Sequence, residues 1–149
     1  MKISPLIRLA NYYETDRMRI IHHSNYIRWF EEARVDYLGK VGMPYSEVEE
    51  MGVMMPVLEV SCEYKSPVHF NDTVVILSKI KEFKGAKITI SYEIYDQKTK
   101  ELRTKGETKH CFVHAETFQP LRLRTDYPEM NERIMKLVGI NIVDWEIKS

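Results

Sequence analysis

Apolar residues recur at helical spacing in one stretch near the start of the chain. They follow one another at steps of four, three and four, which places them on one face of a helix: Tyr26, Phe30, Ala33 and Tyr37. Ser24 or Asn25 is expected to cap the start of this helix, and Gly39 to take the left-handed conformation that ends many helices. The pattern predicts one long, buried helix with an aromatic face.

Downstream, the apolar period changes to two, which is typical of strands with one buried face. In the first such segment the apolar positions are Leu58, Val60, Cys62 and Tyr64. The clearest alternation runs from Lys87 to Ile94, where every second residue is apolar. Four strands joined by short turns are predicted: residues 57–64, 73–83, 87–94 and about 102–117.

Three weaker patterns add to these elements. Residues 5–13 predict a first strand or an extended arm. Ser46 followed by Glu49 has the spacing of a capping box, so a short helix is expected there and should end near Gly52. A last helix is predicted from residue 127 or 128 to residue 138, with a proline in its first turn.

One long helix and several strands joined by short turns favour an α+β fold, in which the helix packs on an antiparallel sheet. The chain has 149 residues, which is the usual size of one domain. We therefore expect a single domain over residues 1–149, with a core over about 5–118 and a C-terminal helix over about 127–138.

Charge and cysteine content narrow the functional classes. Lys and Arg total 22 and Asp and Glu total 22, so net charge gives no general attraction to nucleic acid or to an anionic membrane. No apolar run reaches the length of a membrane span, and the N-terminus lacks the pattern of a signal peptide. Cys62 and Cys111 are far apart, which fits single thiols in a reducing compartment. A cytoplasmic protein is expected.

The histidines do not form a metal-binding pattern. His22 and His23 are direct neighbours, so their side chains point in different directions and no third ligand is clustered with them. His110 and His114 on a strand are better interpreted as structural or solvent-facing residues. No metal and no separate cofactor are expected.

The polar loop before the long helix is the best place for chemistry. Asp16 precedes His23 by seven residues, which is enough chain for its carboxylate to fold back beside the start of the helix. Free N–H groups at a helix start can stabilise an oxyanion, and a carboxylate can attack a carbonyl or activate water. The arrangement suits acyl transfer or hydrolysis, although an aspartate in a polar loop is more often a turn residue.

The segment from Tyr13 to Arg34 resembles the opening motif of the 4-hydroxybenzoyl-CoA thioesterase family. The residues that carry the likeness are Tyr13-Glu14-Thr15-Asp16, Ile20-Ile21, His23, Asn25-Tyr26, Trp29-Phe30-Glu31 and Ala33-Arg34. It continues through 56–67 and 70–74 to about Phe118. The family consists of acyl-CoA thioesterases with a hot-dog fold, so the resemblance implies a long central helix packed against a curved antiparallel sheet.

The resemblance also implies roles for individual residues. Asp16 falls on the catalytic aspartate, which acts as nucleophile or as general base. His23 falls at the helix start, where a backbone N–H receives the thioester oxygen. Asn25 and Tyr26 belong to the same motif and are expected to shape the substrate pocket, and Lys84 matches a position that meets the phosphates of coenzyme A in some relatives.

The implied partner is a second copy of the chain, because family members are homodimers or homotetramers with active sites between subunits. The implied reaction is hydrolysis of an acyl-CoA thioester, with coenzyme A as part of the substrate. Two alternatives stay open: a thioesterase acting on acyl carrier protein thioesters, and an acyl-CoA-binding protein without catalysis. The acyl group is also open.

One position departs from the family pattern. Arg19 stands where the family usually has glycine, three residues after the aspartate. If the backbone there has a positive φ, an arginine strains the loop where a glycine would not.

Overall fold

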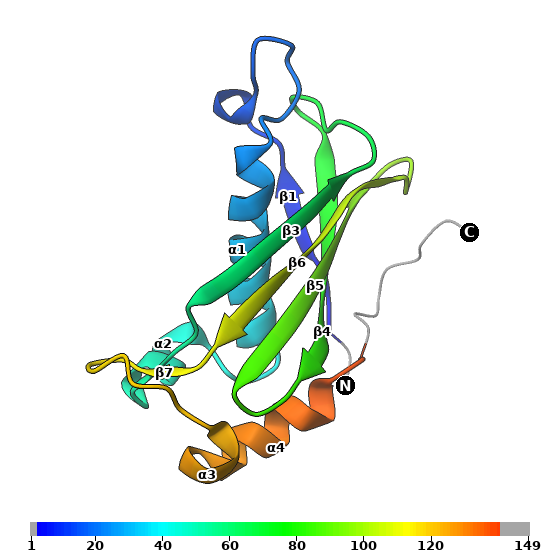
Figure 1. The fold of residues 1–149 in the computed structure, drawn as a ribbon. Coiled ribbons are helices and arrows are strands. Elements are labelled where there is room, and N and C mark those ends of the chain that lie inside the picture. Colours follow the sequence, from blue (N-terminus) through cyan, green and yellow to red (C-terminus); the bar gives the residue numbers. More distant parts are fainter. Residues whose placement is uncertain (1–2, 141–149) are drawn as a thin grey trace.

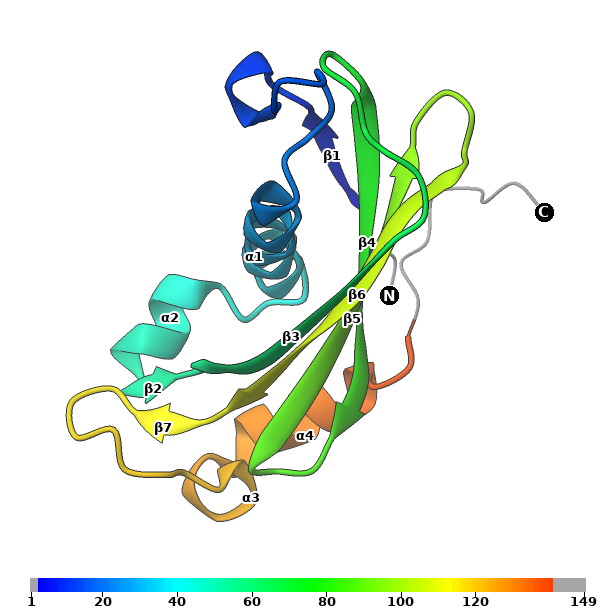
Figure 2. The ribbon, with the colours of Figure 1, turned by 45° about the horizontal axis from the view of Figure 1, so that its top comes forward.

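The structure, a computed structural model, describes residues 3–140 of the chain. A long helix, α1 (Ser24–Lys40), packs against a five-stranded antiparallel sheet that curves around it (Figures 1 and 2). The sheet order is β1 (Leu6–Leu9), β4 (Thr73–Phe83), β5 (Lys87–Asp96), β6 (Leu102–Cys111) and β3 (Val57–Tyr64). The predicted α+β architecture is confirmed.

Smaller elements close the two ends of the molecule. A short 3-10 helix, η1 (Tyr12–Glu14), precedes α1. The other end carries α2 (Tyr45–Glu50), the paired strands β2 (Val53–Met54) and β7 (Val113–His114), and the helices α3 (Leu123–Asp126) and α4 (Pro128–Leu137). Among the described residues, no helix is long and apolar enough to cross a membrane.

Helix α1 has the buried aromatic face that the spacing predicts, but both of its ends differ from the prediction. The N-cap is His23, whose own side chain makes no capping hydrogen bond. At the other end the helix continues through Gly39, and Gly42 takes the left-handed conformation with φ +85°. The N–H of Met43 donates to the Leu38 carbonyl and that of Gly42 to the Gly39 carbonyl, a hydrogen-bond pattern that ends the helix three residues later than expected.

The contact between α1 and the sheet depends on one glycine. The ring of Phe30 stacks on Tyr92 of β5 with 4.6 Å between the ring centroids. A Cβ at Gly106 of β6 would lie 2.6 Å from the Phe30 ring and 2.5 Å from the Ser61 carbonyl oxygen. Only glycine therefore lets the helix approach β6 this closely, and the buried isoleucines of β4 and β5 belong to the same core.

The strand order corrects one expectation about neighbours. β4, β5 and β6 follow one another as hairpins, but β3 pairs with β6 and lies at the opposite edge of the sheet from β1. The connection over residues 65–72 therefore crosses the end of the core instead of forming a hairpin. Val68 in this connection is fully buried, and its carbonyl accepts the Ile21 N–H, so the crossing itself closes the core.

β3 is an exposed edge strand with apolar side chains. Val57, Val60 and Tyr64 are 46%, 40% and 50% exposed. The register with β6 shifts between Val57 and Glu59, so Leu58 lies in a bulge and departs from the predicted alternation. Among residues 3–140, no strand pairs with the outer edge of β3.

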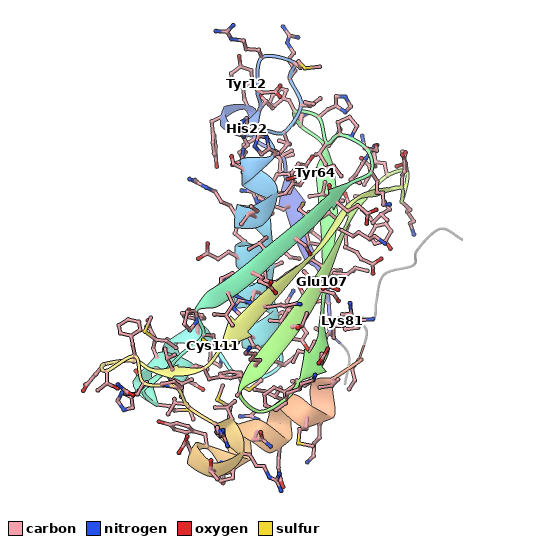
Figure 3. The ribbon with its side chains drawn as sticks, in the orientation of Figure 1. Tyr12, His22, Tyr64, Lys81, Glu107 and Cys111 are labelled. Carbon is pink, nitrogen blue, oxygen red and sulfur yellow. The ribbon has the colours of Figure 1, made fainter. Side chains whose placement is uncertain are left out.

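The outer face of the sheet is charged. Lys81 and Glu107 form an ion pair across it (Figure 3), and Lys109 Nζ lies 3.3 Å from Glu59 Oε2. The two cysteines are half-buried free thiols: Cys62 lies in β3 and Cys111 at the end of β6.

Four boundaries differ from the sequence-based expectation. The first strand is shorter, Leu6–Leu9. The capping box at Ser46 does not form, because the N-cap of α2 is Pro44, two residues earlier than expected; the helix ends just before Gly52, which has a positive φ. The last strand is interrupted at buried Phe112, and α3 precedes the expected C-terminal helix.

Candidate active site

Asp16 lies at the base of a tight hairpin between η1 and α1. Thr15 pairs with Ile21, the Asp16 N–H donates to the Ile20 carbonyl at 2.9 Å, and the Arg19 N–H donates back to the Asp16 carbonyl at 3.1 Å. The Asp16 carboxylate accepts the Met18 N–H through Oδ1 at 2.7 Å. Asp16 is therefore a turn residue, and the hydrogen bond from Met18 fixes the orientation of its carboxylate.

Arg19 has a left-handed backbone conformation, which is unfavourable for a residue with a side chain. Its φ is +65°, in the left-handed region where a side chain costs about 1 kcal/mol or more. The fourth position of such a turn favours glycine for this reason. The strain expected for an arginine in this loop is thus present, while the Asp16 hairpin keeps its hydrogen bonds.

The N-terminal end of the hairpin is anchored by a buried carboxylate, Glu14. Its oxygens accept hydrogen bonds from Arg8 Nη1 at 2.6 Å, Trp29 Nε1 at 2.8 Å and the Asn11 N–H at 3.1 Å. Burial raises the pKa of Glu14, but the hydrogen bonds from Arg8 and Trp29 outweigh burial and hold the pKa below its usual value. Sequence reasoning missed this role, because no spacing rule links Glu14 to Trp29.

The Glu14 carbonyl joins the same hairpin to the start of α1. It accepts the His22 N–H at 2.9 Å and Asn25 Nδ2 at 2.8 Å. Asn25 does not line the pocket that contains Asp16; it lies in a neighbouring hollow with Thr15 and Ser24. In this chain its amide holds the hairpin against the helix.

A pocket of about 340 Å³ opens beside the hairpin and brings together three of the five predicted site residues, Asp16, His23 and Tyr26. Its other lining residues are Ile20, Ile21, Tyr64, Lys65, Ser66 and Pro67. The buried Tyr26 hydroxyl accepts the Val68 N–H at 3.3 Å, which fixes the tyrosine in the wall. Figure 3 shows His22 and Tyr64 at this end of the molecule.

The start of α1 leaves one backbone donor open at this pocket. The N–H groups of Ser24, Asn25 and Tyr26 donate to His22 Nδ1, the His22 carbonyl and the His23 carbonyl. For the His23 N–H, no acceptor is present within residues 3–140. An unoccupied N–H at the positive end of a helix can bind an oxyanion.

The adjacent histidines do not form a metal site in the described part of the chain. Their rings stack with centroids 4.2 Å apart, and His22 Nδ1 lies 2.9 Å from Ser24 Oγ. No group of three possible metal ligands exists among residues 3–140.

Lys84 lies far from Asp16 within one chain. It sits in the β4–β5 turn, at the end of the molecule opposite the η1–α1 loop (Figure 1). Its Nζ lies 2.8 Å from Glu82 Oε1, in a separate hollow of about 380 Å³ that also contains Lys87 and Lys109. A single chain does not bring Lys84 to the pocket.

Comparison with known proteins agrees with this fold. The thioesterase-like superfamily matches residues 11–136. The protein YneP of Bacillus subtilis is 36% identical over 120 residues, which cover 80% of this chain and 86% of YneP. The acyl-CoA thioesterase YbgC of Helicobacter pylori is 26% identical over 83% of this chain and 97% of its own.

A solved structure extends the likeness to three dimensions. The DHNA-CoA thioesterase of Staphylococcus aureus is 34% identical, with a TM-score of 0.84 over 91% of each chain. The broader kinship expected from the opening motif is thereby confirmed, while membership of the 4-hydroxybenzoyl-CoA thioesterase family in particular stays a prediction. The chain belongs to the thioesterase-like superfamily, has the hot-dog fold and is a thioester hydrolase.

Proposed function

We propose that this protein hydrolyses acyl-CoA thioesters with Asp16 as the reacting carboxylate and the His23 N–H as the oxyanion donor. The observation that supports this most is the shared pocket, in which Asp16 and His23 meet at the start of α1. The names of YbgC and of the Staphylococcus aureus enzyme point to coenzyme A thioesters as the substrate class.

The proposed chemistry needs no metal. The free oxygen of Asp16 attacks the thioester carbonyl carbon, and the carbonyl oxygen becomes an oxyanion held by the His23 N–H. Collapse breaks the carbon–sulfur bond and releases coenzyme A thiolate, which takes a proton from water. A second water then opens the mixed anhydride, which releases the acyl group as the free carboxylic acid and regenerates the Asp16 carboxylate. The proton set free neutralises the hydroxide left by the first water. In the alternative path, Asp16 takes a proton from the water that attacks directly.

We also propose that the working unit contains a second copy paired along β3. The unpaired edge and the exposed side chains of Val57, Val60 and Tyr64 are what such pairing would cover. A two-fold axis makes the paired β3 strands antiparallel, so the opposite end of the second copy comes beside the pocket. Lys84 of that copy is then placed near the phosphates of the substrate, where Lys84 of the same chain cannot reach.

The decisive variant is Asp16→Asn. Asparagine keeps the Oδ1 acceptor for the Met18 N–H, so the hairpin and the melting temperature should be preserved. We expect hydrolysis across a panel of acyl-CoAs to fall at least about a hundredfold. Activity near that of the wild type would show that Asp16 is not the reacting carboxylate. Tight binding of acyl-CoA by the wild type without turnover would support an acyl-CoA-binding protein without catalysis. A strong preference for matched acyl carrier protein thioesters would support a thioesterase that acts on that carrier.

A further inference from the structure

The tip of the Asp16 hairpin presents two arginines on a fixed backbone. Arg17 and Arg19 are both exposed, on either side of Met18, which is 76% exposed. The hairpin is closed by the Thr15–Ile21 bridge, and the Ile20–His69 bridge ties it to the 65–72 connection. The two guanidinium groups therefore project from a constrained turn and not from a free loop.

These two arginines differ from their neighbours in having no partner. At the same end of the molecule, Arg8 is paired with Glu14 and Glu32, and Arg103 with Asp96 and Glu101. Lys65, the cation that lines the pocket, is paired with Glu63 at 2.6 Å. For the side chains of Arg17 and Arg19, residues 3–140 offer neither an ion pair nor a hydrogen bond. Their positive charge is available to an external anion.

Arg19 is the more informative of the two because its backbone is strained. A solvated surface charge could be carried at Arg17 or elsewhere on the tip without strain. Arg19 instead occupies the left-handed position, φ +65°, where glycine is favoured. A residue held in an unfavourable conformation without an internal contact in return is a candidate for a functional contact.

The position of the tip fits one particular part of the substrate. Arg19 is three positions after Asp16, so their Cα atoms lie within about 10 Å of each other. The pantetheine arm separates the thioester carbon of acyl-CoA from its diphosphate, which places the phosphates outside the pocket when the thioester reaches Asp16. Guanidinium groups bind phosphate oxygens through paired N–H donors.

We propose that Arg19, assisted by Arg17, binds the phosphates of the thioester carrier at the mouth of the Asp16 pocket. This inference rests on the proposed function, since it concerns the substrate of the same site. The phosphate belongs either to coenzyme A or to a phosphopantetheine arm, and matched substrates distinguish the two sources.

The test compares substrates with and without phosphate. Wild type and Arg19→Gly are assayed with one acyl group carried on coenzyme A, on acyl carrier protein and on N-acetylcysteamine, which has no phosphate. We expect KM for the acyl-CoA to rise roughly three- to tenfold in Arg19→Gly, with kcat nearly unchanged. The N-acetylcysteamine thioester should react equally well with both proteins. A rise in KM that is confined to the acyl carrier protein substrate would assign the contact to its phosphopantetheine arm.

Two further variants separate charge from backbone flexibility. Arg19→Lys keeps a cation and should recover most of the KM, whereas Arg19→Asn tolerates the left-handed backbone without charge and should behave like Arg19→Gly. Lys100→Gly is the matched control, since Lys100 is also a cation at positive φ, 61°, in the β5–β6 turn away from the pocket lining. Its KM should equal that of the wild type.

The outcomes separate this inference from the proposed function. An unchanged KM in Arg19→Gly, or an equal loss of activity on all three substrates, would overturn the phosphate contact, while hydrolysis by the wild type would still support the proposed reaction. Calorimetric binding of free coenzyme A gives a second readout that needs no turnover. Weaker binding by Arg19→Gly supports the contact even if the wild type hydrolyses nothing.

Discussion

Trp29 Nε1 donates a 2.8 Å hydrogen bond to Glu14 Oε2, and this buried contact joins α1 to the residue that begins the Asp16 hairpin. The other carboxylate oxygen of Glu14 accepts Arg8, whose guanidinium also lies 4.8 Å from the centre of the Trp29 ring. Three residues from β1, η1 and α1 therefore fix where the hairpin leaves the core. This cluster therefore determines the position of Asp16.

Replacing Glu14 by glutamine should destabilise the protein by about 2–3 kcal/mol, because it leaves a mostly buried Arg8 with one carboxylate fewer. Urea unfolding of the variant measures the loss. Glu32→Gln is the matched control: Glu32 binds the same Arg8 at 2.9 Å, but its side chain is 47% exposed. We expect that control to lose less than about 1 kcal/mol. Equal losses in the two variants would contradict a special role for the buried carboxylate.

Asn25 should affect turnover through the hairpin and not through contact with substrate. In Asn25→Asp, an oxygen replaces the amide that donates to the Glu14 carbonyl, and the two acceptors repel each other. We expect kcat to fall about ten- to a hundredfold as Asp16 is displaced, with a smaller change in KM. Ser24→Ala, which removes only a contact with His22, should stay near wild-type activity. A change in KM alone would instead indicate direct contact with substrate.

Local patterns in the sequence predict most of this fold. The helical spacing of Tyr26, Phe30 and Ala33 predicts the buried face of α1, and the period of two predicts β3 with the bounds that the structure has. The errors lie where a tertiary contact decides. The left-handed residue that follows α1 is Gly42 and not Gly39. β3 pairs with β6, and buried Val68 fills the end of the core that the connection between β3 and β4 crosses.

The candidate site is predictable only in part. Asp16, His23 and Tyr26 come together because they lie near one helix start, so short-range reasoning suffices for them. Lys84 is different, because within one chain it lies at the far end of the sheet from the pocket. Only a second copy of the chain could place a Lys84 beside the pocket. The buried Glu14 depends on contacts across the fold, which no spacing in the sequence reveals.

His110 should make the protein less stable in mild acid. Burial, with help from the charge of Arg34, lowers the pKa of His110 to about 4, and its ring contacts the Met55 carbonyl and Thr108 Oγ1. A histidine kept neutral by folding stabilises above its unfolded pKa of about 6.5, and that contribution is lost as the pH falls toward 4. We expect a loss of about 2 kcal/mol between pH 8 and pH 5 from this group.

Urea unfolding across this range measures the effect, with His110→Gln as the comparison. The variant cannot titrate there, so its stability should depend less steeply on pH, even if it is less stable at pH 8. Parallel pH profiles for the two proteins would show that another group controls the acid sensitivity.

Val60→Glu should separate the two copies and raise KM for acyl-CoA, because the second copy supplies Lys84 to the phosphates of the substrate. Val60 is 40% exposed on the free edge strand β3, where a second copy would bury it, and a buried unpaired carboxylate opposes association. Light scattering after gel filtration gives the mass, and the acyl-CoA assay gives the activity. Ile7→Glu is the matched control, because Ile7 is 56% exposed on β1 at the other edge of the sheet and should leave a β3-paired dimer intact.

A wild type that is monomeric and fully active at assay concentration would contradict the need for a second copy. If Val60→Glu is monomeric and folded and hydrolyses acyl-CoA with the wild-type KM, Lys84 of a second copy has no part in binding the substrate.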